Sequence, residues 1–520
     1  MQNGKKLLWI DDEIDLLKPH IRFLAEKGYN VDTATNGEDA LAMVKEEQYD
    51  LVFIDEMMPG MGGLKTLSEM KDIQPALPII MITKNEAESL MEEAIGAKIS
   101  DYLIKPVSPS QILLTCKKFL EGKRIEQEHV SRDYVQEFST ISSSLMSPMD
   151  TADWINLYQK IVGWDIELDG HSETGLQGML TEQKRDANNT FGKYIEENYR
   201  DWIHDSSDKP VLSNEVIPEF VLPEIDDNAT VFFFVIDCLR YDQWLLMEKH
   251  LVSDYTISKN WYYGILPTAT PYARNSIFSG LYPSEIEKQN PEIWSKGQDD
   301  DNSRNRYEKE LLDAQLKRLR VTLKPEPKYI KILDPDYGRQ AEQNIQSMTS
   351  SRLVSVVVNF IDMLAHSRSD SDILREIAPN EPAYRSLTES WFRHSWLLRM
   401  FRTIAKQKNV TVIVTTDHGS ILSSRGAKVL GDREASTSLR YKYGRNLKVD
   451  DKHALFVKNP SDMKLPNRGI TANYIIAKED FYFVYPTEYH KYLNQYRDTF
   501  QHGGMSMEEM ILPVVTLKPR

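Results

Sequence analysis

The chain has 520 residues and a formal net charge of −15, with 41% hydrophobic and 27% charged residues. This length predicts about three domains, and the acidic balance argues against broad nucleic-acid binding through phosphate neutralisation. The two cysteines, Cys116 and Cys238, match no metal or disulfide spacing. No apolar run approaches the length of about 18 residues that a membrane span requires, and no signal peptide is evident, so we expect a cytoplasmic protein.

Residues 1–122 alternate short apolar runs with amphipathic segments, including helices expected from Glu13 and over residues 38–47. The runs are KKLLWI, YNVDTAT, DLVFID, PIIMITK and DYLIKP. Five strands interleaved with helices predict an α/β, doubly wound parallel sheet. The ligand site of such a sheet lies beyond the carboxyl ends of its strands.

Polar residues stand where four of these five strands end. They are Asp11, Asp12, Asp55, Thr83 and Lys105. Three carboxylates would repel one another without a cation, so the cluster predicts a hard cation, Mg²⁺, with a lysine beside it.

The DD…D…T…KP pattern, with residues 57–60 (MMPG) after the third aspartate, resembles the receiver domain of bacterial response regulators. The resemblance implies a flavodoxin-like fold in which Asp55 accepts a phosphoryl group from a sensor histidine kinase while the three carboxylates hold Mg²⁺. It also implies that Thr83 and Lys105 contact the phosphoryl oxygens and that Tyr102 is the aromatic switch residue. Phosphorylation, which adds about two negative charges, is then expected to favour a homodimer through the face near Tyr102.

Residues 123–210 are polar and have apolar residues at helical spacing, such as Trp154, Leu157 and Ile161. This pattern predicts a helical-bundle linker between two larger domains. No short glycine-turned helix pair carries a basic face, so we expect no direct DNA binding.

Residues 211–520 contain three apolar runs, VFFFVID, LVSVVVNFID and VTVIVTTDHG, that are separated by polar, helical segments. Such runs predict a mostly parallel sheet flanked by helices. Each run ends in an aspartate, and we expect Asp237, Asp362 and Asp417 to meet at the strand ends.

Three histidines accompany these aspartates: His366, His418 and His502. Three carboxylates and three imidazoles match the ligand demand of two zinc-like ions. The PTATP turn opens an expected helix with Thr270, and a hydroxyl at a helix N-terminus suits a metal-bound nucleophile that faces a phosphate.

These residues, with DCLRYD, LPTATPYAR and SGLYP, resemble the alkaline phosphatase superfamily. The match is closest to the nucleotide pyrophosphatase/phosphodiesterase pattern and looks like a PglZ domain. The resemblance implies one zinc ion on Asp237, Asp417, His418 and Thr270, and a second on Asp362, His366 and His502.

Thr270 rather than Thr268 aligns with the second threonine of the family's PTxT turn, which implies that it is the nucleophile of a two-step, in-line phosphoryl transfer on nucleotide-type diesters. The family has an asparagine three residues after the nucleophile, where this chain has Ala273. Arg274 and Asn275 are the candidates to contact the substrate phosphate instead.

A receiver joined to a PglZ domain resembles the PorX-type regulators of Bacteroidetes. This resemblance implies a role in type IX secretion and a secretion-system or sigma-factor partner. The leading hypothesis is a response regulator whose output is a two-zinc phosphodiesterase or phosphatase. The alternative is a non-catalytic signalling adaptor in which the PglZ domain is a metal-stabilised docking scaffold.

Two charged stretches have no role in this hypothesis. The basic residues of 419–451 predict either a flap that holds phosphate or stacks a base, or a solvated loop. Residues 297–310 are expected to form an exposed acidic insertion.

Overall fold

The computed structural model describes residues 4–84, 95–96, 98–170, 174–204, 207, 209–226, 229–292, 305–432, 436, 438–467 and 472–520. The chain divides into two compact units, Met1–Asp133 and Tyr134–Arg520. Within the described residues, no helix has both the length and the apolar character to cross a membrane.

The first unit is built on a parallel five-stranded sheet in the order β2-β1-β3-β4-β5, as the sequence predicts. Its strands are β1 (Lys6–Ile10), β2 (Asn30–Ala34), β3 (Leu51–Asp55), β4 (Ile79–Thr83) and β5 (Asp101–Ile104). Every residue of β3 and β4 is buried, because helices cover both faces of a doubly wound sheet.

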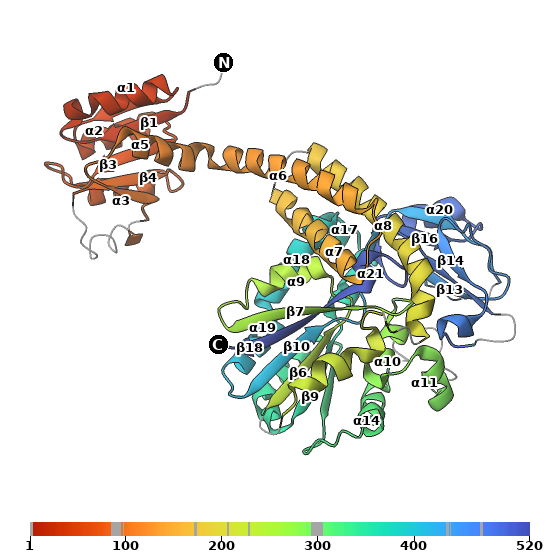
Figure 1. Ribbon diagram of the computed structural model, residues 1–520. Helices are drawn as coiled ribbons and strands as arrows, with labels where there is room; N and C mark the ends of the chain where they lie inside the picture. The colour runs from red at the N-terminus through yellow and green to blue at the C-terminus, as the bar shows by residue number, and fades with distance from the viewer. Residues whose placement is uncertain are drawn as a thin grey trace. The chain divides into compact units, whose positions relative to one another are not determined.

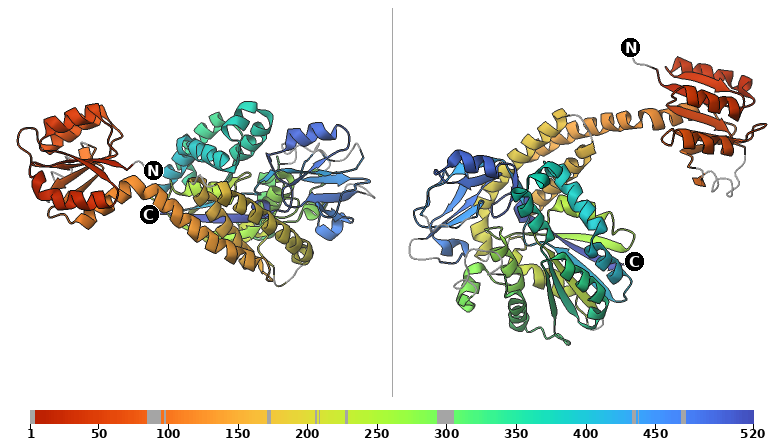
Figure 2. Two further views of the ribbon diagram at one scale, coloured as in Figure 1. Left: turned by 90° about the horizontal axis from the view of Figure 1, so that it is seen from above. Right: turned by 180° about the vertical axis from the view of Figure 1, so that it is seen from behind.

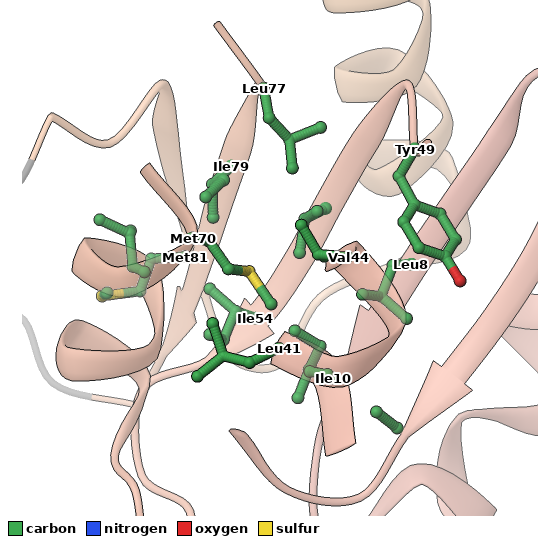
Figure 3. Packing of buried hydrophobic residues seen from close by; sticks show 14 of the residues in the cluster. Leu8, Ile10, Leu41, Val44, Tyr49, Ile54, Met70, Leu77, Ile79 and Met81 are labelled. Atoms are coloured by element: carbon green, nitrogen blue, oxygen red, sulfur yellow. The ribbon is translucent and has the colours of Figure 1, made fainter. Parts of the chain in front are cut away.

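Side chains alternate between the two faces of this sheet. Leu8 and Ile10 point into the core under α2 and α3, which Figure 3 shows from close by. Leu7 and Trp9 point into a second core under α1 and α5. The helical residues are η1 (Ile14–Leu17), α1 (Lys18–Glu26), α2 (Gly37–Glu46), α3 (Gly63–Ile73) and α5 (Pro109–Cys116). The helix expected from Glu13 thus begins as a 3₁₀ turn, and α1 follows with a proline in its first turn.

The linker is helical, as expected. Its helices are α6 (Gly122–Ser144), α7 (Thr151–Glu167) and α8 (Thr174–Ile203). A capping box between Asp150 and Asp153 starts α7. The edge-on packing of Trp154 against Phe191 joins α7 to α8.

The second unit contains a six-stranded sheet in the order β7-β18-β10-β6-β9-β8 (Figures 1 and 2). The strands are β6 (Thr230–Ile236), β7 (Tyr255–Tyr263), β8 (Lys328–Ile332), β9 (Leu353–Val358), β10 (Val410–Thr415) and β18 (Ile511–Pro519). Four neighbouring strands, β10, β6, β9 and β8, are parallel, and β18 runs antiparallel to both β10 and β7. The three predicted runs form β6, β9 and β10, and the sheet is mostly parallel, as expected.

After the linker helices, the second unit also contains eleven α-helices within the described residues. They are α9 (Tyr241–Glu248), α10 (Thr270–Ser279), α11 (Pro283–Gln289), α14 (Glu308–Arg318), α15 (Pro335–Asn344), α16 (Phe360–Asp370), α17 (Asp372–Ile377), α18 (Glu381–His394), α19 (Trp396–Ala405), α20 (Tyr489–Tyr496) and α21 (Met507–Met510). Three small sheets complete the unit, from strands β11 (Ile421–Ser423), β12 (Arg425–Lys428), β13 (Tyr441–Gly444), β14 (Ala454–Val457), β15 (Asn473–Ala477), β16 (Phe481–Val484) and β17 (Thr499–Gln501).

Three parts of the basic stretch 419–451 are strands of these small sheets, β11, β12 and β13, whereas Lys428 and Arg445 are exposed. Arg440 is fully buried and pairs with Glu509. Lys442 is buried and donates to the carbonyl oxygens of Ser436 and Ser438. These cations are held by the protein itself, so the idea of a free basic flap does not apply to them; Arg433 lies outside the described residues.

Two candidate metal centres

The first candidate centre lies at the carboxyl ends of β1, β3 and β5. Lys105 Nζ is 2.5 Å from Asp55 Oδ1 and 2.9 Å from Asp11 Oδ2. Asp12 is exposed, and Thr83 is buried with its hydroxyl hydrogen-bonded to the Glu56 carboxylate. Tyr102 is 38% exposed on β5. The structure therefore brings together Asp11, Asp55 and Lys105, whereas the Thr83 hydroxyl is engaged by Glu56 and Asp12 faces solvent.

Burial and charge pairing have opposite effects on the pKa values of Asp55 and Lys105. Burial raises the pKa of Asp55, while the hydrogen bond and charge of Lys105 act in the opposite direction. Burial by itself would lower the pKa of Lys105, but the Asp55 and Asp11 carboxylates outweigh it and the pKa is raised. A lysine that stays charged between two buried carboxylates is suited to hold an anionic group at Asp55.

The second candidate centre lies at the carboxyl ends of β6 and β10. Asp237 follows β6 directly, and Asp417 and His418 follow β10. Asp362 does not end a strand, contrary to expectation: β9 stops at Val358, and Asp362 lies in the first turn of α16. The helix also explains the spacing of Asp362 and His366, because residues i and i+4 share one helix face.

Six side chains of this centre form two groups that meet the geometric demand of metal ligands. One group is Asp237, Asp417 and His418, and the other is Asp362, His366 and His502. Within each group, the candidate ligand atoms lie within 4.8 Å of one another. The rings of His418 and His502 stack with their centroids 4.2 Å apart, so the two groups are adjacent.

Thr270 joins the first group. Its Oγ1 is 3.0 Å from His418 Nε2. The hydroxyl of Thr268 instead donates a hydrogen bond to the carbonyl oxygen of Gly504. His418 Nδ1 is 3.0 Å from the carbonyl oxygen of Gly419, so Nδ1 carries the proton and Nε2 has a lone pair for a ligand. Thr270 begins α10, where the helix dipole stabilises negative charge on its oxygen.

The carboxylates fit a metal because each leaves an oxygen available. Asp237 Oδ1, Asp362 Oδ1 and Asp417 Oδ2 are buried and have no hydrogen-bond partner among the described residues. The other oxygen of Asp237 accepts from Arg274, and the other oxygen of Asp417 accepts from the His418 N–H. Buried carboxylate oxygens without a partner are costly, and oxygen and imidazole donors suit zinc or a similar ion.

Burial shifts the pKa values of several side chains in this centre. Burial raises the pKa of Asp417 well above its usual range, and the neighbouring Asp237 carboxylate adds to the increase. Burial lowers the pKa of His418. Burial would also raise the pKa of Asp362, but the adjacent His366, with its Nε2 3.4 Å from Oδ1, outweighs burial and lowers that pKa. The centre thus collects carboxylates whose repulsion is relieved by protonation of Asp417 or by a cation.

Arg274 supplies one cation. Its side chain is 1% exposed, and it donates to Asp237 Oδ2 at 2.6 Å and to Glu308 Oε1 at 2.5 Å. Asn275 is also buried, but its amide donates to Pro271 within α10, so the structure brings Arg274 and not Asn275 to the cavity.

Glu308 is the main functional residue that sequence reasoning missed, because it falls in the stretch expected to be an exposed insertion. Residues 297–304 lie outside the described part of the chain, but Asn305 and Glu308 are buried. Glu308 pairs with Arg274, Tyr329 and Lys331. The signal was present: residues 308, 311, 312, 315 and 316 share one helix face, and all of them are buried.

A cavity of about 930 Å³ opens beside Thr270. Asp237, Arg274, Asp362 and His366 line it on the metal side. Asn305, Arg306, Tyr329, Lys331, Leu333, Asn359, Met363 and Ser367 form the rest of its lining. A cavity of this size admits a ligand as large as a nucleotide.

Two curated regulators are similar to the N-terminal part of the chain. The transcriptional regulatory protein ResD of Bacillus subtilis is 35% identical over 23% of this chain and 49% of its own length. The transcriptional regulatory protein ZraR of Salmonella typhimurium is 36% identical over 28% of this chain and 33% of its own length. The chain thus spans half or less of these relatives. The chemotaxis protein CheY4 of Vibrio cholerae is a similar solved structure, with 28% identity, a TM-score of 0.22 and coverage of 22% of this chain and 98% of CheY4.

Three family profiles match successive parts of the chain. The response regulator receiver domain matches residues 7–117, and the PorX response regulator linker domain matches residues 124–203. The profile described as the BREX system PglZ alkaline phosphatase-like domain matches residues 216–517, more than half of the chain. The chain therefore belongs to the PglZ alkaline phosphatase-like family and has the receiver, linker and PglZ architecture of PorX-type response regulators.

Proposed function

We propose that the PglZ domain is a two-zinc phosphodiesterase or phosphatase and the output of a response regulator that is phosphorylated on Asp55. The observation that carries this proposal is the adjacency of two three-ligand groups and the Thr270 hydroxyl beside one cavity. Asp237, Asp417, His418 and Thr270 would hold one zinc ion. Asp362, His366 and His502 would hold the other.

Zinc at these positions supplies positive charge that favours the ionised Thr270 hydroxyl and balances charge on phosphoryl oxygens. Within the protein, the N-terminus of α10 favours negative charge on Thr270 Oγ1. This oxygen attacks phosphorus while the bond from phosphorus to the leaving oxygen breaks and that oxygen takes up a proton. Water then cleaves the phosphothreonine, which releases the phosphate monoester and restores Thr270. Arg274 presents a guanidinium to the same cavity wall, and the buried Glu308 fixes its orientation. We assign Arg274 to the phosphoryl oxygens and Glu308 to the positioning of Arg274.

The substrate that fits these features is a nucleotide-type phosphodiester. Lys331 and Arg306 add positive charge to the cavity beyond the metal ligands, while Tyr329 and Met363 offer aromatic and apolar surface. An anionic group with an attached flat ring satisfies both kinds of lining.

The receiver part of the proposal follows from its own site. Asp11, Asp12 and Asp55 would hold Mg²⁺, Thr83 and Lys105 would contact the phosphoryl group, and a sensor histidine kinase would be the donor. Phosphorylation is proposed to favour a homodimer through the surface near Tyr102. From the PorX linker match we also propose a role in type IX secretion, with a secretion-system or sigma-factor partner.

The test combines metal analysis with turnover of bis-para-nitrophenyl phosphate. We expect two zinc ions per chain, and a loss of kcat of about 10³-fold or more for Thr270→Val, which keeps the shape but removes the nucleophile. Thr270→Ser keeps a hydroxyl and serves as the matched control, with measurable turnover. Wild-type protein without stoichiometric zinc, or full activity in Thr270→Val, would overturn the enzymatic proposal.

The same variants separate the enzyme from the adaptor. An enzyme whose product is the signal loses its secretion phenotype in cells that carry Thr270→Val. A Thr270→Val protein that lacks turnover but supports normal secretion would instead favour the metal-stabilised docking scaffold.

A further inference from the structure

One linker helix, α8, contacts the segments that carry the metal ligands and the nucleophile. Tyr199 Oη accepts a hydrogen bond of 2.9 Å from the Leu266 N–H, just before the turn that leads to Thr270. Nearer the start of the helix, Asn188 forms hydrogen bonds to α21, which follows His502 in the chain. The helix itself supplies no ligand to either three-residue group.

Asn188 uses both ends of its amide. Its Nδ2 donates to Glu508 Oε2 at 3.0 Å, and its Oδ1 accepts from the Met507 N–H at 2.8 Å. Asn188 is 3% exposed and Glu508 is 5% exposed. A buried amide that is satisfied on both sides fixes its partner in position, because losing either bond leaves a buried polar group unpaired.

The short helix α21 in turn abuts the ligand loops. A Cβ atom added to Gly419, the residue after His418, would lie 1.9 Å from the Glu508 carbonyl oxygen, so the two backbones are in direct contact. On the other side, Glu509 Oε1 accepts from the Gly504 N–H at 2.8 Å, two residues after His502. A shift of α21 would therefore displace both histidines.

A partly buried ion network makes a second connection between α8 and the segment after Asp237. Lys184 of α8 lies 2.6 Å from Glu381 and 3.1 Å from Asp165 of α7. The other oxygen of Glu381 is 2.9 Å from Arg240, three residues after Asp237, and Arg240 is 2% exposed. Such a network favours one arrangement of its members, because separating Glu381 from Arg240 would leave a buried charge uncompensated.

We infer that α8 is a positioning helix that couples the linker to the metal centre, and that Asn188 is its principal contact. The inference rests on the proposed metal centre and adds an element that controls it. Coupling between two sites is reciprocal. If the Asn188 contact raises zinc affinity, zinc binding stabilises α8 and α21 by the same factor, and a movement of the linker changes zinc affinity.

The experiment is a double-mutant cycle on the full chain. Asn188→Asp keeps the acceptor for Met507 but places a carboxylate against Glu508. Glu508→Gln keeps the hydrogen bond, since its amide can turn its oxygen toward Asn188. The double variant restores a pair with the roles reversed, because the glutamine amide introduced at position 508 donates to the carboxylate introduced at position 188.

Two readouts are measured at pH 8: zinc affinity by competition with a chromophoric chelator, and hydrogen exchange over residues 180–192 and 502–510 with and without zinc. We expect Asn188→Asp to weaken zinc binding about tenfold, a typical coupling magnitude, and to abolish the zinc-dependent protection of α8. The double variant and Glu508→Gln should remain within about twofold of wild type, on the same reasoning.

Arg185→Gln is the matched control, because Arg185 lies on the same helix with its side chain 36% exposed and pairs only with Glu182 among the ion pairs of the described residues. If Asn188→Asp fails to fold by circular dichroism, Tyr199→Phe tests the second contact of α8, with an expected loss of about threefold in zinc affinity.

Unchanged zinc affinity in a folded Asn188→Asp protein, or no rescue in a folded double variant, would overturn the inference while leaving the metal centre intact. A wild-type protein that binds no zinc would instead overturn the proposed function on which the inference rests.

Discussion

The receiver centre and the PglZ centre solve the same electrostatic problem differently. Both gather aspartates at the carboxyl ends of parallel strands. In the receiver, Lys105 lies between Asp11 and Asp55 with its side chain 17% exposed, and Asp12 faces solvent. In the PglZ domain, Asp237 and Asp417 are at most 1% exposed.

The sites differ more in the burial of the cation than in the burial of the aspartates, since Asp11 and Asp55 are also buried. A site whose lysine and one carboxylate reach solvent tolerates the arrival and departure of a cation and a phosphoryl group. The group of Asp237, Asp417 and His418 is buried and has carboxylate oxygens without a hydrogen-bond partner among the described residues, which favours a cation that stays bound. We therefore expect the receiver to respond to transient ligands and this first PglZ group to hold its metal as part of the fold, whereas the second group is more open, with His366 55% exposed.

The largest expected effect separates the two sites completely. Asp55→Asn should abolish labelling by acetyl phosphate, because the acceptor carboxylate is gone, and Thr270→Val should label normally. Phosphate-affinity electrophoresis of both variants measures this. Labelling of Asp55→Asn at the wild-type level would place the acceptor elsewhere.

Removal of the cation from each site should cost unequal stability. Arg274→Met removes the arginine that pairs with the buried Asp237, while Glu308 keeps Lys331, and we expect it to destabilise the metal-free PglZ unit by about 3–5 kcal/mol. Lys105→Met should cost the receiver less, about 1–2 kcal/mol, because the Lys105 side chain is 17% exposed and water can replace part of its contact with Asp55. Calorimetry in chelator compares the two unfolding transitions, and equal losses would contradict the difference in burial.

The pH dependence of folding stability tests the burial of Lys442 in the PglZ domain. Burial lowers the pKa of Lys442 to about 8. Between this value and the pKa of an unfolded lysine, near 10.4, the unfolded chain binds more protons, so folding stability rises with pH in that window. We expect a gain of about 2 kcal/mol for wild type relative to Lys442→Met between pH 8 and pH 10, measured by urea unfolding of metal-free protein. Parallel curves for the two proteins would contradict a depressed pKa.

The smallest effect concerns the exposed side of the receiver centre. Asp12→Asn removes one carboxylate charge near the ion and should weaken Mg²⁺ binding by about tenfold. The free energy of unfolding of the receiver should change little, because Asp12 is exposed. Calorimetric titration with Mg²⁺ measures the affinity. Asp11→Asn should lower the stability of the receiver more than Asp12→Asn does, since Asp11 also pairs with Lys105.

Much of both sites was predictable because motif residues follow the strands directly. Apolar runs mark β1, β3, β6 and β10, and the polar residue after each run must lie at the ligand-binding edge of a parallel sheet. Asp362 was placed wrongly because the run LVSVVV continues into the apolar first turn of α16, and sequence alone does not mark where the strand stops. Glu308 was expected to be exposed because it lies in a strongly charged stretch, although the apolar residues after it have helical spacing.

The three-part architecture, the parallel sheets and the polar residues at their edges can be predicted from the amino-acid sequence, since these depend on local periodicity and on motifs of a few residues. Which side chains meet one another depends on the packing of the whole chain. Arg274 with Glu308, His418 with His502 and Asn188 with Glu508 are contacts between distant segments. Their energies come from burial and pairing, which no single segment contains.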